Sequence, residues 1–309
     1  MEFVSLRSWN ALPEMPAEKE HLPTILLGAL AKAVKEYIRC RLSIRVSSLF
    51  HPLLLHPYKI NFPCMSLNRE MVQQGQWLFR YRSYLPLVLL AGGLAVSYLG
   101  NNPLQGFERD MLALCAGLAG LAVRMHVVGH APKNTSGRNT AEGQVADQLN
   151  TTGLYSLVRH PLYVGNFLMW LSPAIMVGNP WFISVFALVF ALYYERIMMA
   201  EEAYLTGKFG TIYLQWAGKT PAFFPKWTGY VPTGVPVSWK KILRKEKNGL
   251  FALALVNYIL EQWQMGWSSG AWLTQPWTFW GYSTVTGLVL YLILKFLKYQ
   301  TRWLSDDRG

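Results

Sequence analysis

Two short segments of the chain hold the residues that could carry out chemistry, and the first is the sequence RHPLYVGN. Pro161 suits the first turn of a helix, with His160 near the cap of that helix. Tyr163 and Asn166 would then lie three residues apart on one helical face. A helix start carries partial positive charge and unpaired N–H groups, and Arg159 adds a full charge. The segment therefore predicts a binding site for a carboxylate or a phosphate.

A simpler interpretation of RHPLYVGN is also open. Arg159 and His160 could contact lipid headgroups, with Tyr163 as an interfacial aromatic residue. Basic and aromatic residues are common at the edge of a bilayer, so this motif alone does not decide between a ligand site and a lipid contact.

The second segment is a carboxylate pair, Glu201 and Glu202, which follows an apolar run directly. Carboxylates at the edge of a membrane helix cost free energy unless they are paired or hydrated, so a functional role is favoured. The alternative is that they form the solvated start of the next helix, which is predicted over residues 203–217. That helix is amphipathic, and it is predicted to lie on a membrane surface through Leu205, Phe209, Ile212, Tyr213 and Trp216.

The composition indicates which elements position these segments. Apolar residues make up 52% and charged residues 15% of the 309 residues, whereas a soluble domain carries about 25% charged residues. The predicted fold class is all-α, a polytopic integral membrane helical bundle of about six transmembrane helices. The fifth run holds Asn257 and Glu261, so it could instead lie on the surface. The six apolar runs are residues 84–99, 111–128, 161–177, 180–199, 250–265 and 277–297.

The third and fourth runs form a predicted hairpin that joins the two polar segments. A turn of two or three residues returns the chain to the same side of the membrane, so RHPLYVGN and the carboxylate pair would face one cavity. The walls of that cavity would carry both positive and negative charge. S-adenosylmethionine has a carboxylate, an ammonium, a ribose diol and a sulfonium, and it needs such a mixed lining.

The positive charge of the chain, +12 in total, is unevenly distributed. If the six runs cross a membrane, the loops on one side hold nearly all of the Lys and Arg residues, and the opposite loops hold only Arg109. This pattern predicts a multi-pass protein with both termini cytoplasmic, in a bacterial inner membrane or an endoplasmic reticulum. The orientation of the protein in a lipid bilayer then explains its positive charge, and no nucleic acid partner is expected.

Three regions are predicted along the chain. Residues 1–64 are poorly patterned and could lie outside the fold, with translation starting at Met65. Residues 65–225 form a predicted four-span core, and residues 226–309 form a connector with two further spans. The TSGRNT segment (residues 135–140) has no assigned role, and the oligomeric state is not assigned either.

The cysteines do not indicate a metal site or a disulfide framework, because their spacing fits neither. No metal is therefore predicted. The three cysteines are Cys40, Cys64 and Cys115.

RHPLYVGN, then GNP, then EE-xx-L-xxx-FG-xx-Y together resemble the C-terminal half of the isoprenylcysteine carboxyl methyltransferase and phospholipid methyltransferase superfamily. The resemblance runs from about Thr151 to Pro225. It implies a membrane methyltransferase that binds S-adenosylmethionine between the third and fourth runs. The acceptor would be a lipid or a lipid-linked small molecule.

The resemblance also assigns site residues. Arg159 and Glu202 match positions important for activity and are the predicted catalytic residues. Glu202 would serve as a base if the acceptor is an amine. Residues 147–150 match a cofactor-binding stretch by position but not by residue type. The predicted cofactor-binding residues are Tyr155, His160, Pro161, Leu162, Tyr163 and Glu201.

One departure and two rival functions accompany this assignment. Ile197 stands where the prenylcysteine enzymes have a substrate-contacting arginine, which argues against a prenylcysteine carboxylate as substrate. An NADPH-dependent membrane reductase of the sterol or steroid type would share an RHxxYxG element, but two carboxylates suit a cationic sulfonium better than a polyphosphate. A transporter would carry charges deep in the bilayer and inverted repeats, whereas these charges lie at one edge.

Overall fold

The computed structural model describes residues 67–82, 84–100, 102–132, 138–140, 143–269 and 277–300. The predictions for residues 1–64 and for a start at Met65 lie outside the described residues, as does the first half of the TSGRNT segment. The elements are α2 (Leu67–Tyr81), α3 (Leu85–Tyr98), α4 (Gly106–His130), β1 (Arg138–Thr140), β2 (Gly143–Val145), the 3-10 turn η1 (Leu154–Ser156), α5 (Pro161–Val177), α6 (Pro180–Phe209), α7 (Thr211–Ala217), α8 (Trp239–Ser269) and α9 (Phe279–Gln300).

Each predicted apolar run lies in a helix, in the order α3, α4, α5, α6, α8 and α9. The all-α class is confirmed apart from the short antiparallel hairpin of β1 and β2. Three of the described helices, α4, α6 and α9, are long and apolar enough to cross a membrane, whereas α5 and most of α3 are apolar but shorter. The protein therefore has membrane-spanning helices, and the count of about six spans stays a prediction.

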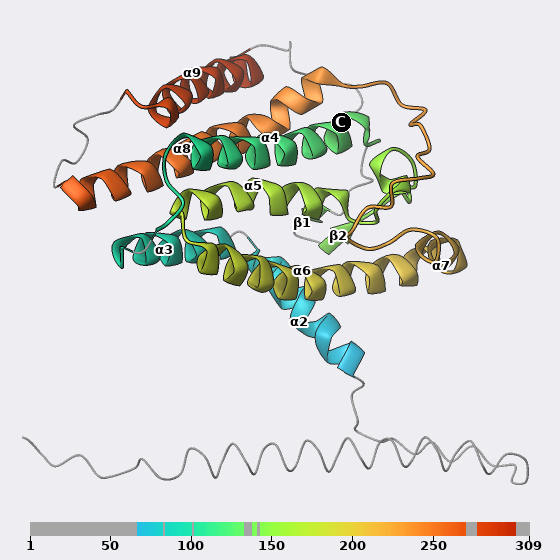
Figure 1. Ribbon diagram of the computed structural model, residues 1–309. Coiled ribbons are helices and arrows are strands. Elements are labelled where there is room, and N and C mark those ends of the chain that lie inside the picture. Colours follow the sequence, from blue (N-terminus) through green and yellow to red (C-terminus); the bar gives the residue numbers. More distant parts are fainter. Residues whose placement is uncertain are drawn as a thin grey trace, which may run out of the picture. The chain divides into compact units, whose positions relative to one another are not determined.

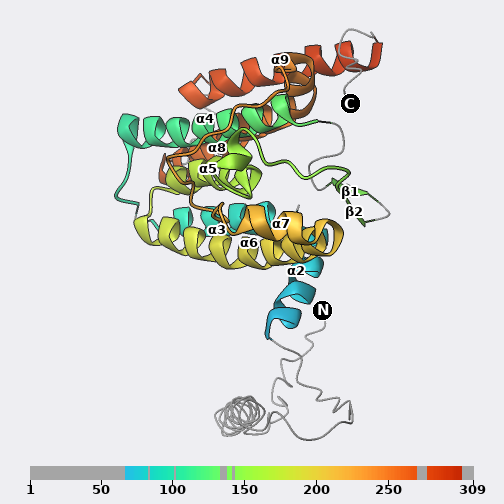
Figure 2. The same ribbon diagram turned by 90° about the vertical axis from the view of Figure 1, so that its right-hand side faces the viewer.

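Helix α5 lies in the middle of the bundle. It contacts α3, α4, α6 and α8, and the two ribbon views place it between α4 and α6 (Figures 1 and 2). Helices α4 and α5 approach most closely where glycines face each other. A Cβ atom added to Gly120 would lie 2.6 Å from the carbonyl oxygen of Gly165. Small residues of this kind let membrane helices pack backbone to backbone, which fixes the start of α5 against α4.

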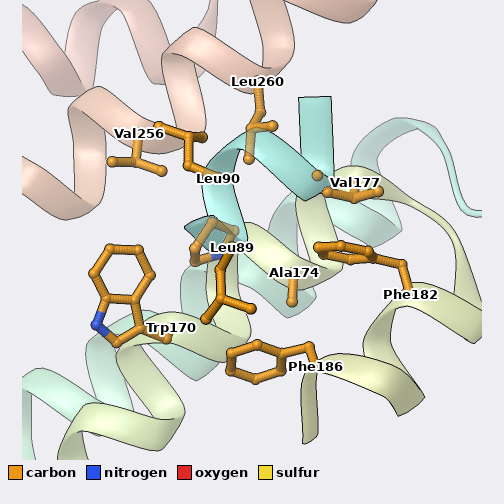
Figure 3. A pocket seen from close by; sticks show the side chains of 11 residues that line it. Leu89, Leu90, Trp170, Ala174, Val177, Phe182, Phe186, Val256 and Leu260 are labelled. Atoms are coloured by element: carbon orange, nitrogen blue, oxygen red, sulfur yellow. The ribbon is translucent and has the colours of Figure 1, made fainter. Parts of the chain in front are cut away.

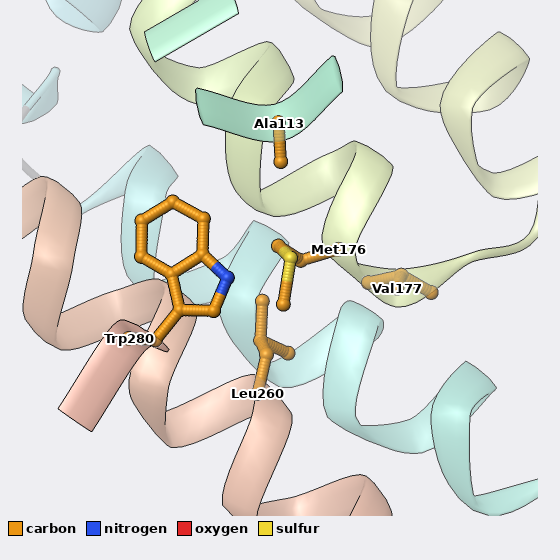
Figure 4. Packing of buried hydrophobic residues seen from close by; sticks show 5 residues of the cluster. All are labelled: Ala113, Met176, Val177, Leu260 and Trp280. Carbon is orange, nitrogen blue, oxygen red and sulfur yellow. The ribbon is translucent and has the colours of Figure 1, made fainter. Parts of the chain in front are cut away.

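The core of the bundle joins the C-terminal helices to the rest. Ala113, Met176, Val177, Leu260 and Trp280 form one buried cluster, contributed by α4, α5, α8 and α9 (Figure 4). Beside it, apolar side chains from α3, α5, α6 and α8 surround a space of only about 20 Å³ (Figure 3). This part of the bundle is filled by apolar side chains. It serves as the packed core that holds the helices carrying the polar site residues.

Polar side chains hold α8 inside the bundle. Asn257 is fully buried and donates a hydrogen bond to the hydroxyl of Ser172 on α5 at 2.9 Å. Glu261 is 8% exposed and accepts a hydrogen bond from Thr278 at 2.5 Å. The polar residues of the fifth run are therefore buried inside the bundle, and the crossing of a membrane by this run stays a prediction.

The segment after the carboxylate pair differs from its prediction. Helix α6 continues past Glu202 to Phe209 and ends at Gly210, whose φ of +54° favours glycine. The short helix α7 then follows in a new direction (Figure 1). The predicted single helix over residues 203–217 is therefore wrong. Tyr213 is 2% exposed and faces the protein rather than a membrane surface, whereas Ile212 is 66% exposed.

Helix α2 packs along α6. A Cβ atom on Gly75 would collide with the backbone of Arg196, so the two helices touch at that point. Near the end of α2, the hydroxyl of Tyr193 donates to the carbonyl oxygen of Leu78 at 2.9 Å. This packing places Arg82, which follows α2, near the polar residues of α5 and α6.

Candidate functional site

The two polar segments meet where α5 begins and α6 approaches its end. Pro161 is the first residue of α5, and His160 is its N-cap. The hydroxyl of Tyr163 donates to a carboxylate oxygen of Glu201 at 2.9 Å. His160 Nδ1 lies 3.4 Å from the same Glu201 oxygen, and His160 Nε2 lies 3.1 Å from Glu202. The predicted meeting of the motif and the carboxylate pair is confirmed.

The imidazole of His160 is held between the two carboxylates. It is 5% exposed and stacks on the ring of Tyr163 at a centroid distance of 5.5 Å. Burial alone would lower the pKa of His160, but its hydrogen bonds to Glu201 and Glu202 outweigh burial, and the net pKa is raised. The imidazolium form is therefore favoured, which offsets part of the negative charge of the pair.

Arg159 links the start of α5 to the segment after α7. Its Nη2 atom lies 2.9 Å from Glu202. Its Nη1 atom donates to the carbonyl oxygens of Ala217 at 2.8 Å and Thr220 at 3.2 Å. The backbone N–H of Arg159 donates to the carbonyl oxygen of Pro221 at 2.8 Å. These contacts hold the guanidinium in one position. Among them, Glu202 supplies the one carboxylate, and the other partners are neutral carbonyl groups.

Two cavities share this polar wall. The α7 cavity measures about 30 Å³ and reaches the loop before η1, and the arginine cavity measures about 230 Å³ and reaches α2 and α4. The α7 cavity is lined by Ala146, Gln148, Leu149, Asn150, Tyr155, Arg159, His160, Glu201, Leu205, Tyr213 and Trp216. The arginine cavity is lined by Arg82, Arg124, Tyr155, Arg159, His160, Leu162, Tyr163, Asn166 and Glu201.

Two buried donors at the α7 cavity, Nε of Arg159 and the indole N–H of Trp216, make no hydrogen bond within the described chain. The hydroxyl of Tyr213 is buried beside them and interacts with Glu202. Buried donors without partners are rare in proteins, so they indicate a ligand that carries several acceptors. Burial, with the nearby charge of Glu201, raises the pKa of Tyr155, whose phenol therefore stays protonated as a further donor.

The structure brings most of the predicted residues to these cavities. Tyr155, Arg159, His160 and Glu201 line both, and Leu162 and Tyr163 line the arginine cavity. Part of the predicted 147–150 stretch lines the α7 cavity.

Two predicted residues lie behind the walls. Pro161 is fully buried where α5 begins. Glu202 is absent from the described linings of both cavities, and its carboxylate contacts Arg159 and His160 instead. Its contacts are those of a residue that supports two site residues.

Among the lining residues with a polar or charged group, sequence reasoning missed Arg82, Arg124, Tyr213 and Trp216. Tyr213 and Trp216 carried a signal, because their spacing on an amphipathic helix shows a common face, but the pattern does not show what that face contacts. Arg82 and Arg124 reach the cavity from helices distant in sequence, and no local pattern indicates that.

Arg124 belongs to a network that crosses three helices. Its Nε and Nη2 atoms each lie 2.9 Å from a carboxylate oxygen of Glu246 on α8. Its Nη1 atom donates to the side-chain oxygen of Asn166 on α5. The Glu246 side chain is 5% exposed and that of Arg124 25%. This two-pronged ion pair ties α8 to the edge of the arginine cavity.

Comparison with known proteins covers the same region. The phospholipid methyltransferase family matches residues 113–212, which hold α5, α6 and the polar wall. A cobalt-zinc-cadmium resistance protein of Cupriavidus metallidurans is 33% identical over 156 residues, which are 50% of this chain and 68% of that protein. A protein-S-isoprenylcysteine O-methyltransferase of Schizosaccharomyces pombe is 40% identical over 79 residues, 25% of this chain and 33% of that enzyme. The chain belongs to the isoprenylcysteine carboxyl methyltransferase and phospholipid methyltransferase superfamily.

Membership of this methyltransferase superfamily rests on part of each chain. A nickel-cobalt-cadmium resistance protein of Alcaligenes xylosoxydans is 38% identical over 84 residues, which cover 27% of this chain and 39% of that protein. The match to that relative and the match to the yeast enzyme therefore span well under half of their lengths. No solved structure matches the chain. Arg82 and Glu246 lie outside the residues matched by the superfamily.

Proposed function

We propose that this protein transfers a methyl group from S-adenosylmethionine to a lipid or lipid-linked acceptor at the membrane. The observation that carries the proposal is a chain of polar contacts of 3.4 Å or less that runs from Tyr163 through Glu201, His160 and Glu202 to Arg159. Acids and cations alternate from Glu201 to Arg159. Superfamily membership supports methyl transfer as the reaction.

The lining residues suit S-adenosylmethionine chemically. When bound, this cofactor supplies a methyl group on a cationic sulfonium. Glu201 would provide the negative charge that attracts a cation, and Tyr155, His160 and Tyr163 would keep that carboxylate in place. The unpartnered donors of Trp216 and Arg159 would serve the acceptor atoms of the cofactor, its carboxylate and its hydroxyl groups. Pro161 and Leu162 would contribute packing at the start of α5.

Arg159 and Glu202 would have different tasks in this reaction. Arg159 lines both cavities, so we propose that its guanidinium orients an anionic part of one reactant. Glu202 holds Arg159 at 2.9 Å and His160 at 3.1 Å, so we propose that it positions these residues. A carboxylate oxygen between two cations is a weak base, and a role of Glu202 as general base is favoured only if the acceptor is an amine.

Alignment in a dry site is the main contribution that the protein would make. A neutral leaving group needs no acid, and proximity with exclusion of water supplies most of the acceleration. The stacked ring of Tyr163 and the buried imidazole of His160 would exclude water from one side of Glu201.

Isothermal titration calorimetry of the detergent-purified protein with S-adenosylhomocysteine tests the proposal. We expect micromolar binding, weakened at least tenfold in Glu201→Gln, because a lost charge-assisted interaction is worth about 1.5–3 kcal/mol. Glu195→Gln is the matched control, since Glu195 lies on the same helix, is 54% exposed and pairs with Arg196. Saturable binding of NADPH without binding of S-adenosylhomocysteine would refute methyl transfer and indicate a reductase.

A further inference from the structure

Three arginines line the arginine cavity, and two of them, Arg124 and Arg159, are bound to carboxylates of the chain. Arg124 uses three of its nitrogens on Glu246 and Asn166. Arg159 is bound to Glu202 and to two backbone carbonyls. All three nitrogens of the Arg124 guanidinium are therefore occupied, and the one remaining donor of Arg159, its Nε, is the one proposed above to serve the cofactor.

Arg82 differs from the other two. Within the described part of the chain, its guanidinium makes no hydrogen bond and no salt bridge. Its carbon atom Cζ lies 4.0 Å from the ring centroid of Phe79, a buried residue, and this contact holds the side chain at the cavity. Glu201 lies on the same cavity but is already bonded to Tyr163 and His160. The charge of Arg82 interacts with that of Glu201, but no hydrogen bond joins the two side chains, so the guanidinium donors of Arg82 remain available to an anion from outside the chain.

An apolar pocket adjoins the arginine cavity. Arg124 and Asn166 line both spaces, so the two share a common wall. The pocket measures about 180 Å³, lies between α4, α5 and α8, and is otherwise lined by Met169, Trp170, Pro173, Gly249, Ala252, Leu253 and Val256. A ligand with an anionic end and a hydrocarbon tail would meet matching surfaces on the two sides of this wall.

The position of the unpartnered donors indicates which cavity would hold the cofactor and which would hold the methyl acceptor. Trp216, whose indole N–H has no partner, and Tyr213 line the α7 cavity and not the cavity of Arg82, whereas Arg159 lines both. A transfer reaction needs two adjoining sites, and Tyr155, Arg159, His160 and Glu201 form the boundary between these two. An anionic group of the cofactor has donors at the α7 cavity and does not require Arg82.

We propose that Arg82 is the specificity-determining residue that binds an anionic group of the methyl acceptor, and that the tail of the acceptor lies in the pocket between α4, α5 and α8. This rests on the proposed function, and it adds a residue and a helix that lie outside the superfamily match. Carboxylates and phosphates share the chemistry that a guanidinium recognises, so either could supply the anion.

Binding of single-chain amphiphiles to the full-length protein saturated with S-adenosylhomocysteine tests the assignment. The carboxylate arm compares S-farnesyl-N-acetylcysteine with its neutral methyl ester, and the phosphate arm compares lysophosphatidic acid with a monoacylglycerol. We expect one anionic probe to bind at least tenfold more tightly than its neutral partner, and Arg82→Gln to remove that preference, because a charged hydrogen bond is worth about 1.5–3 kcal/mol. Arg82→Lys should restore part of it, and Arg80→Gln, an exposed change on α2, should leave it unchanged.

Three outcomes overturn the proposal. The first is a wild-type protein that prefers neither anionic probe. The second is an Arg82→Gln protein that keeps the preference. The third is an Arg82→Gln protein with weakened affinity for S-adenosylhomocysteine, which would assign Arg82 to the cofactor. The same probes used without S-adenosylhomocysteine separate this idea from the proposed function: anion preference in a protein that binds no S-adenosylhomocysteine would sink the methyltransferase proposal alone.

Discussion

Replacing Glu246 by glutamine is expected to loosen α8 from α4 and α5. Glu246 accepts two hydrogen bonds of 2.9 Å from Arg124, and its side chain is 5% exposed. A glutamine has nearly the same size and still accepts one hydrogen bond, so the main change is loss of the charge that compensates the guanidinium.

The expected size of the effect follows from burial. Breaking a buried ion pair by removing one partner destabilises a protein by about 3–5 kcal/mol, because the remaining charge is left uncompensated. The Arg124 side chain is 25% exposed and also bonds to Asn166, so we expect the lower end of that range, about 3 kcal/mol. The Glu195–Arg196 pair is also 2.9 Å long, but Glu195 is 54% exposed, so Glu195→Gln should cost at most about 0.5 kcal/mol.

Reversible unfolding in mixed micelles with increasing sodium dodecyl sulfate, followed by circular dichroism, measures both free energies. The double variant Arg124→Leu with Glu246→Leu removes both charges and should lie within about 1 kcal/mol of the wild type. The reasoning is refuted if Glu246→Gln changes the free energy of unfolding no more than Glu195→Gln does. It is also refuted if the double variant is as unstable as the single one.

Two further predictions use the same unfolding assay. Since the pKa of His160 is raised above the unfolded value of about 6.5, its contribution to stability is present below that pH and lost as the pH rises through the folded pKa; the free energy of unfolding should therefore fall with rising pH more steeply in the wild type than in His160→Gln, and equal slopes would contradict this. Gly120→Val should destabilise by about 1–3 kcal/mol or more, because its Cβ would lie 2.6 Å from backbone atoms of Gly165 and Met169. Gly207→Ala, with nothing within 4 Å, should not destabilise, and a similar loss in both would argue against close packing of α4 on α5.

Much of the fold could be predicted because hydrophobic runs in a membrane protein mark helices directly. All six runs lie in helices. The helices extend beyond the ends of the apolar runs wherever polar residues continue the helix. The fourth apolar run ends at residue 199, but helix α6 continues to Phe209 and ends at Gly210. Helix α8 begins at Trp239 rather than at residue 250, since its basic first turns are helical but not apolar.

The candidate site could be predicted where its members are close in sequence or joined by a short hairpin. His160, Tyr163 and the two glutamates meet because the chain turns back at Gly178, whose φ is +79°. The contributions of Arg82 and Glu246 come from helix packing, which no local pattern encodes. Tyr213 was assigned to a membrane surface because an amphipathic pattern shows which face is apolar and does not show its neighbour.

The pairing of Arg124 with Glu246 also sets an order of events during synthesis. The two residues are 122 positions apart, so at about 5–20 residues per second the ribosome makes the partner roughly 6 to 24 seconds after Arg124. Throughout that interval α4 carries a guanidinium whose carboxylate does not yet exist. Chains that terminate before α8 keep this exposed charge permanently. The charge of Arg124 is thus compensated only once α8 has been made.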